Sequence, residues 1–87
     1  MTINLEKRLG VIAVIIEDPP EIQAKVNELI SASGRIVIGR MGIPHWERNI
    51  ATLALIVEGT ENEINTLTGS LGNLPGVSAR ATMAKKS

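Results

Sequence analysis

The stretch that decides the fold is Lys7–Glu17, which reads KRLGVIAVIIE. Its β-branched residues and its short length predict a β-strand rather than a helix. The sequence Asp18-Pro19-Pro20-Glu21 breaks this strand, and Pro20 suits the first turn of a helix, because its missing N–H would be unpaired there. Ser33-Gly34 should end that helix, with Gly34 as a left-handed cap. The apolar positions that predict it, at helical spacing, are Ile22, Val26, Leu29 and Ile30.

The rest of the chain alternates between strands, turns and one further helix. Gly39 and Gly42 fall inside the second predicted strand and indicate a bulge or a close backbone approach. Residues 84–87 form a tail that we expect to be disordered. The predicted elements, in chain order, are a strand at Arg35–Pro44, a polar turn at His45–Asn49, a strand at Ile50–Glu58, a helix from Thr60 or Glu61, a turn at Asn73–Gly76 and a strand at Val77–Met83.

The order strand, helix, strand, strand, helix, strand is that of the split βαβ, or ferredoxin-like, arrangement. It predicts an α+β sandwich of the form βαββαβ. The four-stranded antiparallel sheet should have the strand order 4-1-3-2, with both helices on one face. Residues 1–87 should form a single domain, because this length suits one domain and no low-complexity segment interrupts it.

The first and third strands are apolar on both faces, which bears on assembly. Two helices can cover only one face of the sheet, so the other face is expected to meet a second copy of the chain, in a homodimer or homotetramer. The alternative is a monomer whose central strands tolerate some exposed Ile and Val. Edge pairing along the second strand is a further contact open to the chain. The two apolar sets of the first strand are Leu9, Val11, Ala13 and Ile15 on one side and Ile12, Val14 and Ile16 on the other.

Composition limits the classes of partner. The chain has no Cys and one His, which excludes disulfides, thiolate metal sites and multi-histidine zinc sites within one chain. Self-association is therefore the expected means of stabilising so small a core. Nine basic residues balance nine acidic ones without a basic stripe, so the chain by itself should not bind nucleic acid. No apolar run is long enough to cross a bilayer and Met1–Glu6 does not resemble a signal peptide, so we expect a cytoplasmic protein without membrane contacts.

Signals of catalysis are weak in the sequence. No nucleophile-elbow pattern surrounds any Ser, and Gly69-Ser70-Leu71-Gly72 lacks the Lys and the strand-to-helix context of a phosphate loop. Paired acids such as Glu61 and Glu63 suit a helix start, where negative charge is favoured. We therefore expect a protein that is not an enzyme and carries no cofactor.

The predicted hairpin turn holds most of the residues that we expect to bind a ligand or a partner. Trp46, the only aromatic residue, stands on this polar turn and could anchor a ligand, or else cover the end of the core or a neighbouring subunit. Arg40 could equally guard the edge strand. His45 as a metal ligand would need symmetry mates, so no metal site is predicted. The candidate binding residues are Asp18, Pro19, Arg40, His45, Trp46 and Arg48.

A series of motifs spans nearly the whole chain: Glu6–Arg8, Val26–Ile30, Arg40–Pro44, Glu47 with Asn49–Ala51, and Ile64–Val77. In this order they resemble the small regulators of the iron-only hydrogenase system. The resemblance implies an ACT-like domain, similar to amino-acid-sensing modules and to the regulatory half of nickel-responsive repressors. Such domains assemble through their sheets and bind small effectors at subunit interfaces.

Two departures from those relatives concern the ligand. The first strand-to-helix loop, Glu17-Asp18-Pro19-Pro20, has no Gly where amino-acid-binding ACT domains commonly carry one. Nickel-responsive domains use several His and a Cys, whereas this chain has only His45 and no Cys. The resemblance also implies regulation in anaerobic hydrogen metabolism. A transcriptional role would need a partner, because the chain has no DNA-binding segment.

Two hypotheses on function follow. The first is an oligomeric regulatory module that senses a small-molecule effector in a pocket between subunits, lined by the first loop, Arg40 and the turn at His45–Asn49. The second is a non-catalytic structural module that binds a regulated protein through Trp46 and takes no ligand.

Overall fold

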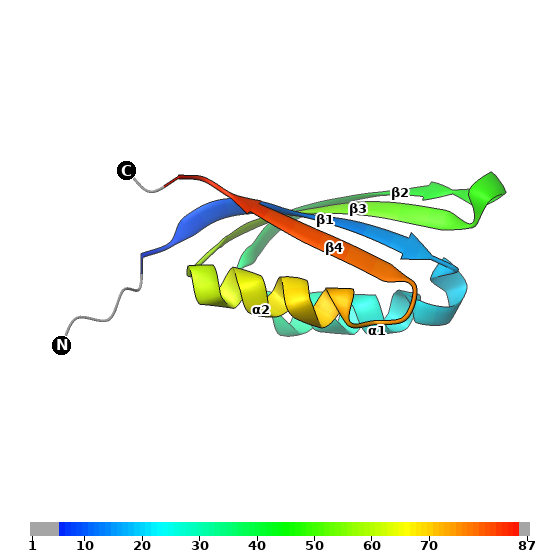
Figure 1. The fold of residues 1–87 in the computed structure, drawn as a ribbon, viewed down its shortest axis with the longest axis horizontal. Coiled ribbons are helices and arrows are strands. Elements are labelled where there is room, and N and C mark those ends of the chain that lie inside the picture. The colour runs from blue at the N-terminus through cyan, green and yellow to red at the C-terminus, as the bar shows by residue number, and fades with distance from the viewer. Residues whose placement is uncertain (1–5, 86–87) are drawn as a thin grey trace.

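The computed structural model describes residues 6–85, apart from the side chain of Trp46. The predicted βαββαβ order is confirmed (Figure 1). A short 3-10 turn, Trp46–Arg48, joins the two strands of the central hairpin. The other elements are β1 (Arg8–Glu17), α1 (Pro19–Ala32), β2 (Val37–His45), β3 (Ile50–Gly59), α2 (Glu61–Gly72) and β4 (Val77–Met83).

The four strands form one sheet in the order β2-β3-β1-β4, with every neighbouring pair antiparallel. This is the predicted order 4-1-3-2, read from the other edge. Both helices lie on the same face of the sheet, and the tip of the β2–β3 hairpin projects beyond them (Figure 1). The predicted irregularity in β2 is present, because the pairing with β3 shifts register between Val37 and Gly39.

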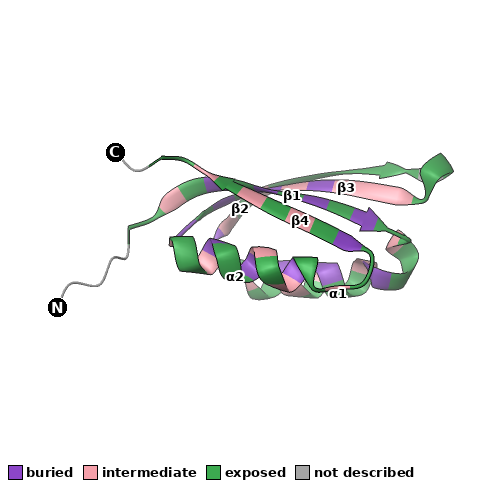
Figure 2. Ribbon diagram, in the orientation of Figure 1, coloured by how far each residue is buried: buried purple, intermediate pink, exposed green. Residues whose placement is uncertain are grey.

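The core lies between the sheet and the helices, and strand alternation decides which residues enter it. Every second residue of β1 from Gly10 to Ile16 is buried, and the residues between them are exposed. Figure 2 shows the same banding along the ribbon. The buried side chains of the sheet and helices are Ile12, Val14, Ile16, Ile22, Val26, Ile30, Ile36, Leu53, Leu55, Val57, Ile64, Leu67, Leu71 and Val77.

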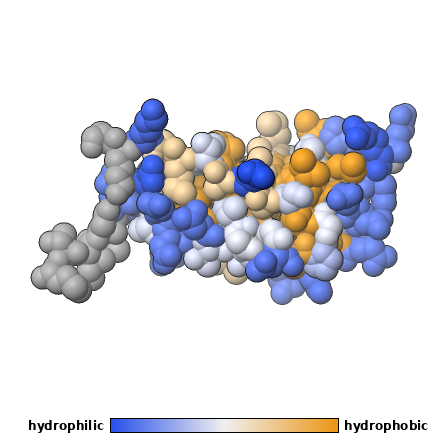
Figure 3. All heavy atoms as spheres, viewed as in Figure 1, coloured by the Kyte–Doolittle hydropathy of each residue, from blue (hydrophilic) through white to orange (hydrophobic). Residues whose placement is uncertain are grey.

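No helix among the described residues covers the opposite face of the sheet (Figure 1). This face is apolar along β1, β2 and β3, whereas β4 contributes Ser78, Arg80 and Thr82 to it. We call it the open face; its exposed apolar residues belong to β1, β2 and β3. In the view of Figure 3, hydrophilic residues gather mostly toward the two ends of the molecule, and apolar residues reach the surface between them. The prediction that two central strands are apolar on both sides is thus confirmed. The exposed fractions are 37% for Val11, 47% for Ile15, 65% for Met41, 52% for Ile43 and 41% for Ile56.

The ends of the helices differ from expectation at one point. The predicted left-handed cap at Gly34 is wrong: among the described glycines only Gly76 has a positive φ, of 75°. Helix α1 ends instead through successive tight turns, in which the Gly34 N–H donates to the Ser31 carbonyl at 3.1 Å. Helix α2 begins with a capping box, since the Glu63 N–H donates to Thr60 Oγ1 at 3.1 Å and the Thr60 N–H donates to Glu63 Oε1 at 2.9 Å.

The expected disorder of the tail is also wrong at its first residue. The Ala84 N–H donates to the Leu9 carbonyl at 2.8 Å, and the Ala84 carbonyl accepts from Arg8 Nη2 at 2.6 Å. These bonds continue the pairing of β4 with β1 past Met83. Residues 86 and 87 of the predicted tail lie outside the described residues.

Candidate functional site

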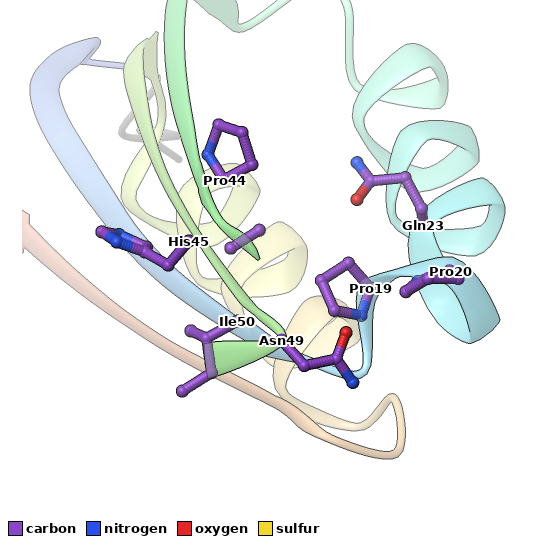
Figure 4. A pocket seen from close by; sticks show the side chains of 8 residues that line it. Pro19, Pro20, Gln23, Pro44, His45, Asn49 and Ile50 are labelled. Carbon is purple, nitrogen blue, oxygen red and sulfur yellow. The ribbon is translucent and has the colours of Figure 1, made fainter. Parts of the chain in front are cut away.

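A groove separates the N-terminal half of α1 from the β2–β3 hairpin (Figure 4). It consists of two neighbouring hollows, of about 310 and 180 Å³, which share Gln23, Pro44 and Ala51 as lining residues. The larger hollow lies beside the hairpin turn and the smaller one further along β2. The larger is lined by Pro19, Pro20, Gln23, Pro44, His45, Asn49, Ile50 and Ala51.

Alternation along β2 decides which side chains face the groove. Arg40, Gly42 and Pro44 share the side that faces α1, and all three line the smaller hollow. Because Gly42 has no side chain, the space between Arg40 and Pro44 stays open. A Cβ atom at Gly42 would lie 3.3 Å from Leu53 Cδ1. A side chain at position 42 would therefore occupy space in the smaller hollow, next to the residues that the two hollows share.

Arg40 spans the smaller hollow from β2 to α1. Its Nη2 donates to Asn27 Oδ1 at 3.2 Å. A guanidinium carries five N–H donors, and among the described residues Asn27 is its only hydrogen-bonding partner. Arg40 is thus held at one point, with most of its donors directed at solvent or at the groove.

Two residues with left-handed backbones close the end of the groove. Asp18, with φ 56°, precedes α1, and Asn49, with φ 53°, precedes β3. The Asp18 N–H donates to the Asn49 carbonyl at 3.1 Å, and Asn49 Nδ2 donates to Asp18 Oδ1 at 2.5 Å. We call this pair the Asp18–Asn49 clasp; it ties the start of α1 to the hairpin turn and so sets the width of the groove there.

His45 belongs to the rim of the groove and to the open face. Its imidazole points away from α1 in Figure 4. Its Nε2 lies 3.3 Å from Thr52 Oγ1, which belongs to the next strand. His45 therefore links the groove to the open face across the edge of the sheet.

The structure brings together some of the residues proposed from sequence and leaves others apart. Pro19 and His45 line the larger hollow and Arg40 the smaller one. Asp18 reaches the groove only through the clasp, and it lines a separate, acidic hollow beside the start of α1. Arg48 is exposed in the 3-10 turn and lines neither hollow. The side chain of Trp46 lies outside the described residues, so the expectation that it anchors a ligand is not tested.

The sequence did not point to Gln23 or Pro44 as groove residues, whereas Asn49 lies in the turn that was expected to line the pocket. Pro44 could have been identified from the sequence, because residues 40, 42 and 44 alternate along the strand and therefore lie on the same side of β2. Gln23 carried no signal, since it is one of several polar residues on α1.

The described residues hold no group of three or more His, Cys, Asp or Glu that could bind a metal ion. Within the same part of the chain, no helix has the length and apolar character needed to cross a membrane. The groove combines an apolar lining with the polar groups of Gln23, Asn49 and Arg40, a composition typical of sites for small organic ligands.

The chain resembles known proteins in sequence and in fold. The TM1266-like family model, described as "Iron-only hydrogenase system regulator, putative", matches residues 8–81. No protein with a curated description matches the chain. The structure of uncharacterized protein TM1266 from Thermotoga maritima superposes with a TM-score of 0.87 at 30% sequence identity, covering 92% of this chain and 100% of that one.

Two more distant structures share the fold. The C-terminal domain of the MgtC protein from Mycobacterium tuberculosis has a TM-score of 0.71 at 16% identity, covering 97% of this chain and 94% of its own. A "putative PII-like signaling protein" from Thermus thermophilus has a TM-score of 0.64 at 18% identity, covering 94% of this chain and 90% of its own. At these identities the likeness concerns the fold alone.

Proposed function

This chain belongs to the TM1266-like family of iron-only hydrogenase system regulators, and on that premise we propose that it is a non-catalytic regulatory module of the cytoplasm. In this proposal it associates with itself through the open face of its sheet and senses a small effector in the groove beside β2. The observation that carries the proposal is that β2 serves both surfaces. Its residues alternate between the groove and the open face.

The open face supports self-association. The register places Val11 opposite Ile56 and Ala13 opposite Ala54, so apolar residues of β1 and β3 adjoin on this face. Met41 and Ile43 extend the same surface onto β2, opposite Ala54 and Thr52. A contiguous apolar surface on one side of a small sheet is typical of a protein interface. A second copy of the chain is the simplest partner, because symmetric dimers are the commonest oligomers.

The position of β2 supports the proposal that effector binding in the groove changes self-association. Arg40, Gly42 and Pro44 line the groove on one side of this strand; Met41 and Ile43 alternate with them and are exposed, and Ile43 also borders the smaller hollow. β2 is an edge strand, bonded to β3 alone. A ligand that displaces this strand within the groove would therefore displace two residues of the proposed interface. An effector can shift the assembly only by binding its two states with different affinity.

Sedimentation velocity on the full chain tests self-association. We expect a dimer or tetramer for the native chain and a smaller species for Ile15→Glu, which places a charge on the open face. Asn65→Glu, on an exposed position of α2, is the matched control and should leave the mass unchanged. A native chain that sediments as a monomer contradicts this part of the proposal.

A thermal-shift screen against small metabolites tests sensing. A ligand at a hundred times its dissociation constant should stabilise the folded state by about 2.7 kcal/mol. Sedimentation of the native chain with each stabilising compound then shows whether binding changes assembly. An oligomer that responds to no compound favours the alternative, a structural module that binds a regulated protein without a ligand.

A further inference from the structure

The residues that line the groove indicate the chemical class of ligand that would fit it. Its larger hollow is lined by three prolines, Pro19, Pro20 and Pro44, and by Ala51, which is opposite Pro44 in the sheet. Its volume of about 310 Å³ is at the low end for small-molecule sites. This part of the groove thus suits a compact apolar group rather than a large polar one.

The start of α1 contributes few hydrogen-bond donors to this hollow. A helix N-terminus commonly binds anions through its unpaired N–H groups. Here the first two positions of the helix are Pro19 and Pro20, which have no N–H. The Glu21 N–H donates to the Asp18 carbonyl at 3.1 Å. The wall that could have bound an anionic group is therefore apolar.

The smaller hollow supplies the charge that the larger one lacks. Arg40 is the only formally charged side chain among the described residues that line the two hollows. Its single bond to Asn27 leaves donors free for a carboxylate, which a guanidinium binds through two parallel hydrogen bonds. Gly42 lies between Arg40 and Pro44 on the same side of β2 and adds no side chain there.

Among the described residues, the groove has no acidic side chain that could pair with the ammonium group of a ligand. Asp18, which lines a separate hollow, accepts a hydrogen bond from Asn49 within the clasp. The positive end of the α1 dipole also disfavours a cation at this end of the groove.

We propose that the groove binds a small carboxylic acid with an apolar body and no amino group, the body against the prolines and the carboxylate on Arg40. This inference rests on the proposed sensing function and names the chemical class of its ligand. A free amino acid of the same shape is discriminated against, because its ammonium group would lose hydration without gaining an acceptor.

Three probes of equal carbon skeleton test this class: isocaproate, leucine, which adds an ammonium group, and isohexanol, which has no charge. Titration of the isotope-labelled full chain, followed by amide NMR, should show isocaproate shifting Gly42, Ala51 and the Gln23 side-chain amide in a saturable way. Leucine and isohexanol should bind more weakly, isohexanol by about tenfold or more, since a hydrogen bond to a charged group contributes ~1.5–3 kcal/mol.

Variants assign the effect to residues. Arg40→Gln should weaken isocaproate by about tenfold or more and abolish its advantage over isohexanol, which a purely structural role of Arg40 would not do. Arg48→Gln, in the neighbouring turn but outside the groove, is the matched control and should bind as the native chain does. Gly42→Ala, which keeps the charge and occupies space in the smaller hollow, should weaken isocaproate as well.

The outcomes separate this inference from the proposed function. It is overturned if leucine or isohexanol binds as tightly as isocaproate, if the shifts lie away from the groove, or if isocaproate causes none. It is also overturned if the metabolite screen yields a ligand of another class whose affinity Arg40→Gln leaves unchanged, in which case sensing itself stands. Only the lack of any response across the whole screen counts against sensing.

Discussion

Asp18 and Asn49, which are 31 positions apart in the chain, are bonded to each other twice, and both have left-handed backbones. One bond is between main-chain atoms and the other between side chains. A left-handed backbone costs an ordinary residue about 1–2 kcal/mol, and Asn and Asp tolerate it better than most. The residue types at both positions are thus suited to the conformation that joins α1 to the hairpin turn.

Substitutions at Asn49 should separate backbone from side-chain effects. Asn49→Ala loses the bond to Asp18 and places an Ala at φ 53°, so we expect a destabilisation of about 1–3 kcal/mol in urea unfolding. Asn49→Gly loses the same bond but adopts this backbone freely, so it should be clearly less destabilised. Equal losses in the two variants would contradict the role given to the backbone.

Two glycines should respond to alanine in opposite directions. A Cβ atom at Gly59 would lie 2.8 Å from Ile36 Cγ2 and 3.0 Å from Glu63 Oε1, so Gly59→Ala should destabilise by about 1–3 kcal/mol. At Gly69, inside α2, a Cβ atom would meet nothing within 4 Å, so Gly69→Ala should stabilise by about 0.5–1 kcal/mol. Thermal unfolding of both variants measures this; a stabilising Gly59→Ala would show that Ile36 can move aside.

The capping box of α2 should make stability depend on acidic pH. The hydrogen bond from the Thr60 backbone, with the nearby Arg35, lowers the pKa of Glu63 below its ordinary value of 4.5. The unfolded chain then binds this proton more readily than the folded one, so the contribution is fully present above pH 4.5 and is lost as the pH falls through the lowered pKa.

Urea unfolding of the native chain and of Glu63→Gln across this range measures the effect. The difference in unfolding free energy between them should be constant well above pH 4.5 and should shrink below it. Glu28→Gln, at an exposed position of α1, is the control. An identical pH dependence of the native chain and Glu63→Gln would count against the capping carboxylate.

If the open face joins two copies of the chain, thermal stability should depend on protein concentration. Association stabilises the folded state by mass action, so the unfolding midpoint of the native chain should rise with concentration. Ile15→Glu should show a midpoint that does not change with concentration, whereas Asn65→Glu should behave as the native chain does. Differential scanning calorimetry over a range of dilutions measures this, and a constant native midpoint would argue for a monomer.

Much of the fold was predictable because its signals are local. The alternation in Lys7–Glu17 and the helical spacing from Ile22 to Ile30 each follow from the geometry of a single element. The order of the elements then leaves few ways to build a sheet with right-handed crossovers. The prediction at Gly34 was wrong for a related reason: a glycine permits a left-handed cap but does not require one, and successive tight turns satisfied the same backbone groups.

By itself the sequence determined the βαββαβ architecture, the two-sided apolar strands and the absence of Cys, because composition and periodicity do not depend on distant contacts. Only the tertiary structure decided the groove. It required β2 to lie beside α1, so that Arg40 meets Asn27 and Pro44 shares a hollow with Gln23. These contacts depend on the register of the sheet and on how the helix packs against it. Register and packing bring together side chains whose separation along the chain does not predict a contact.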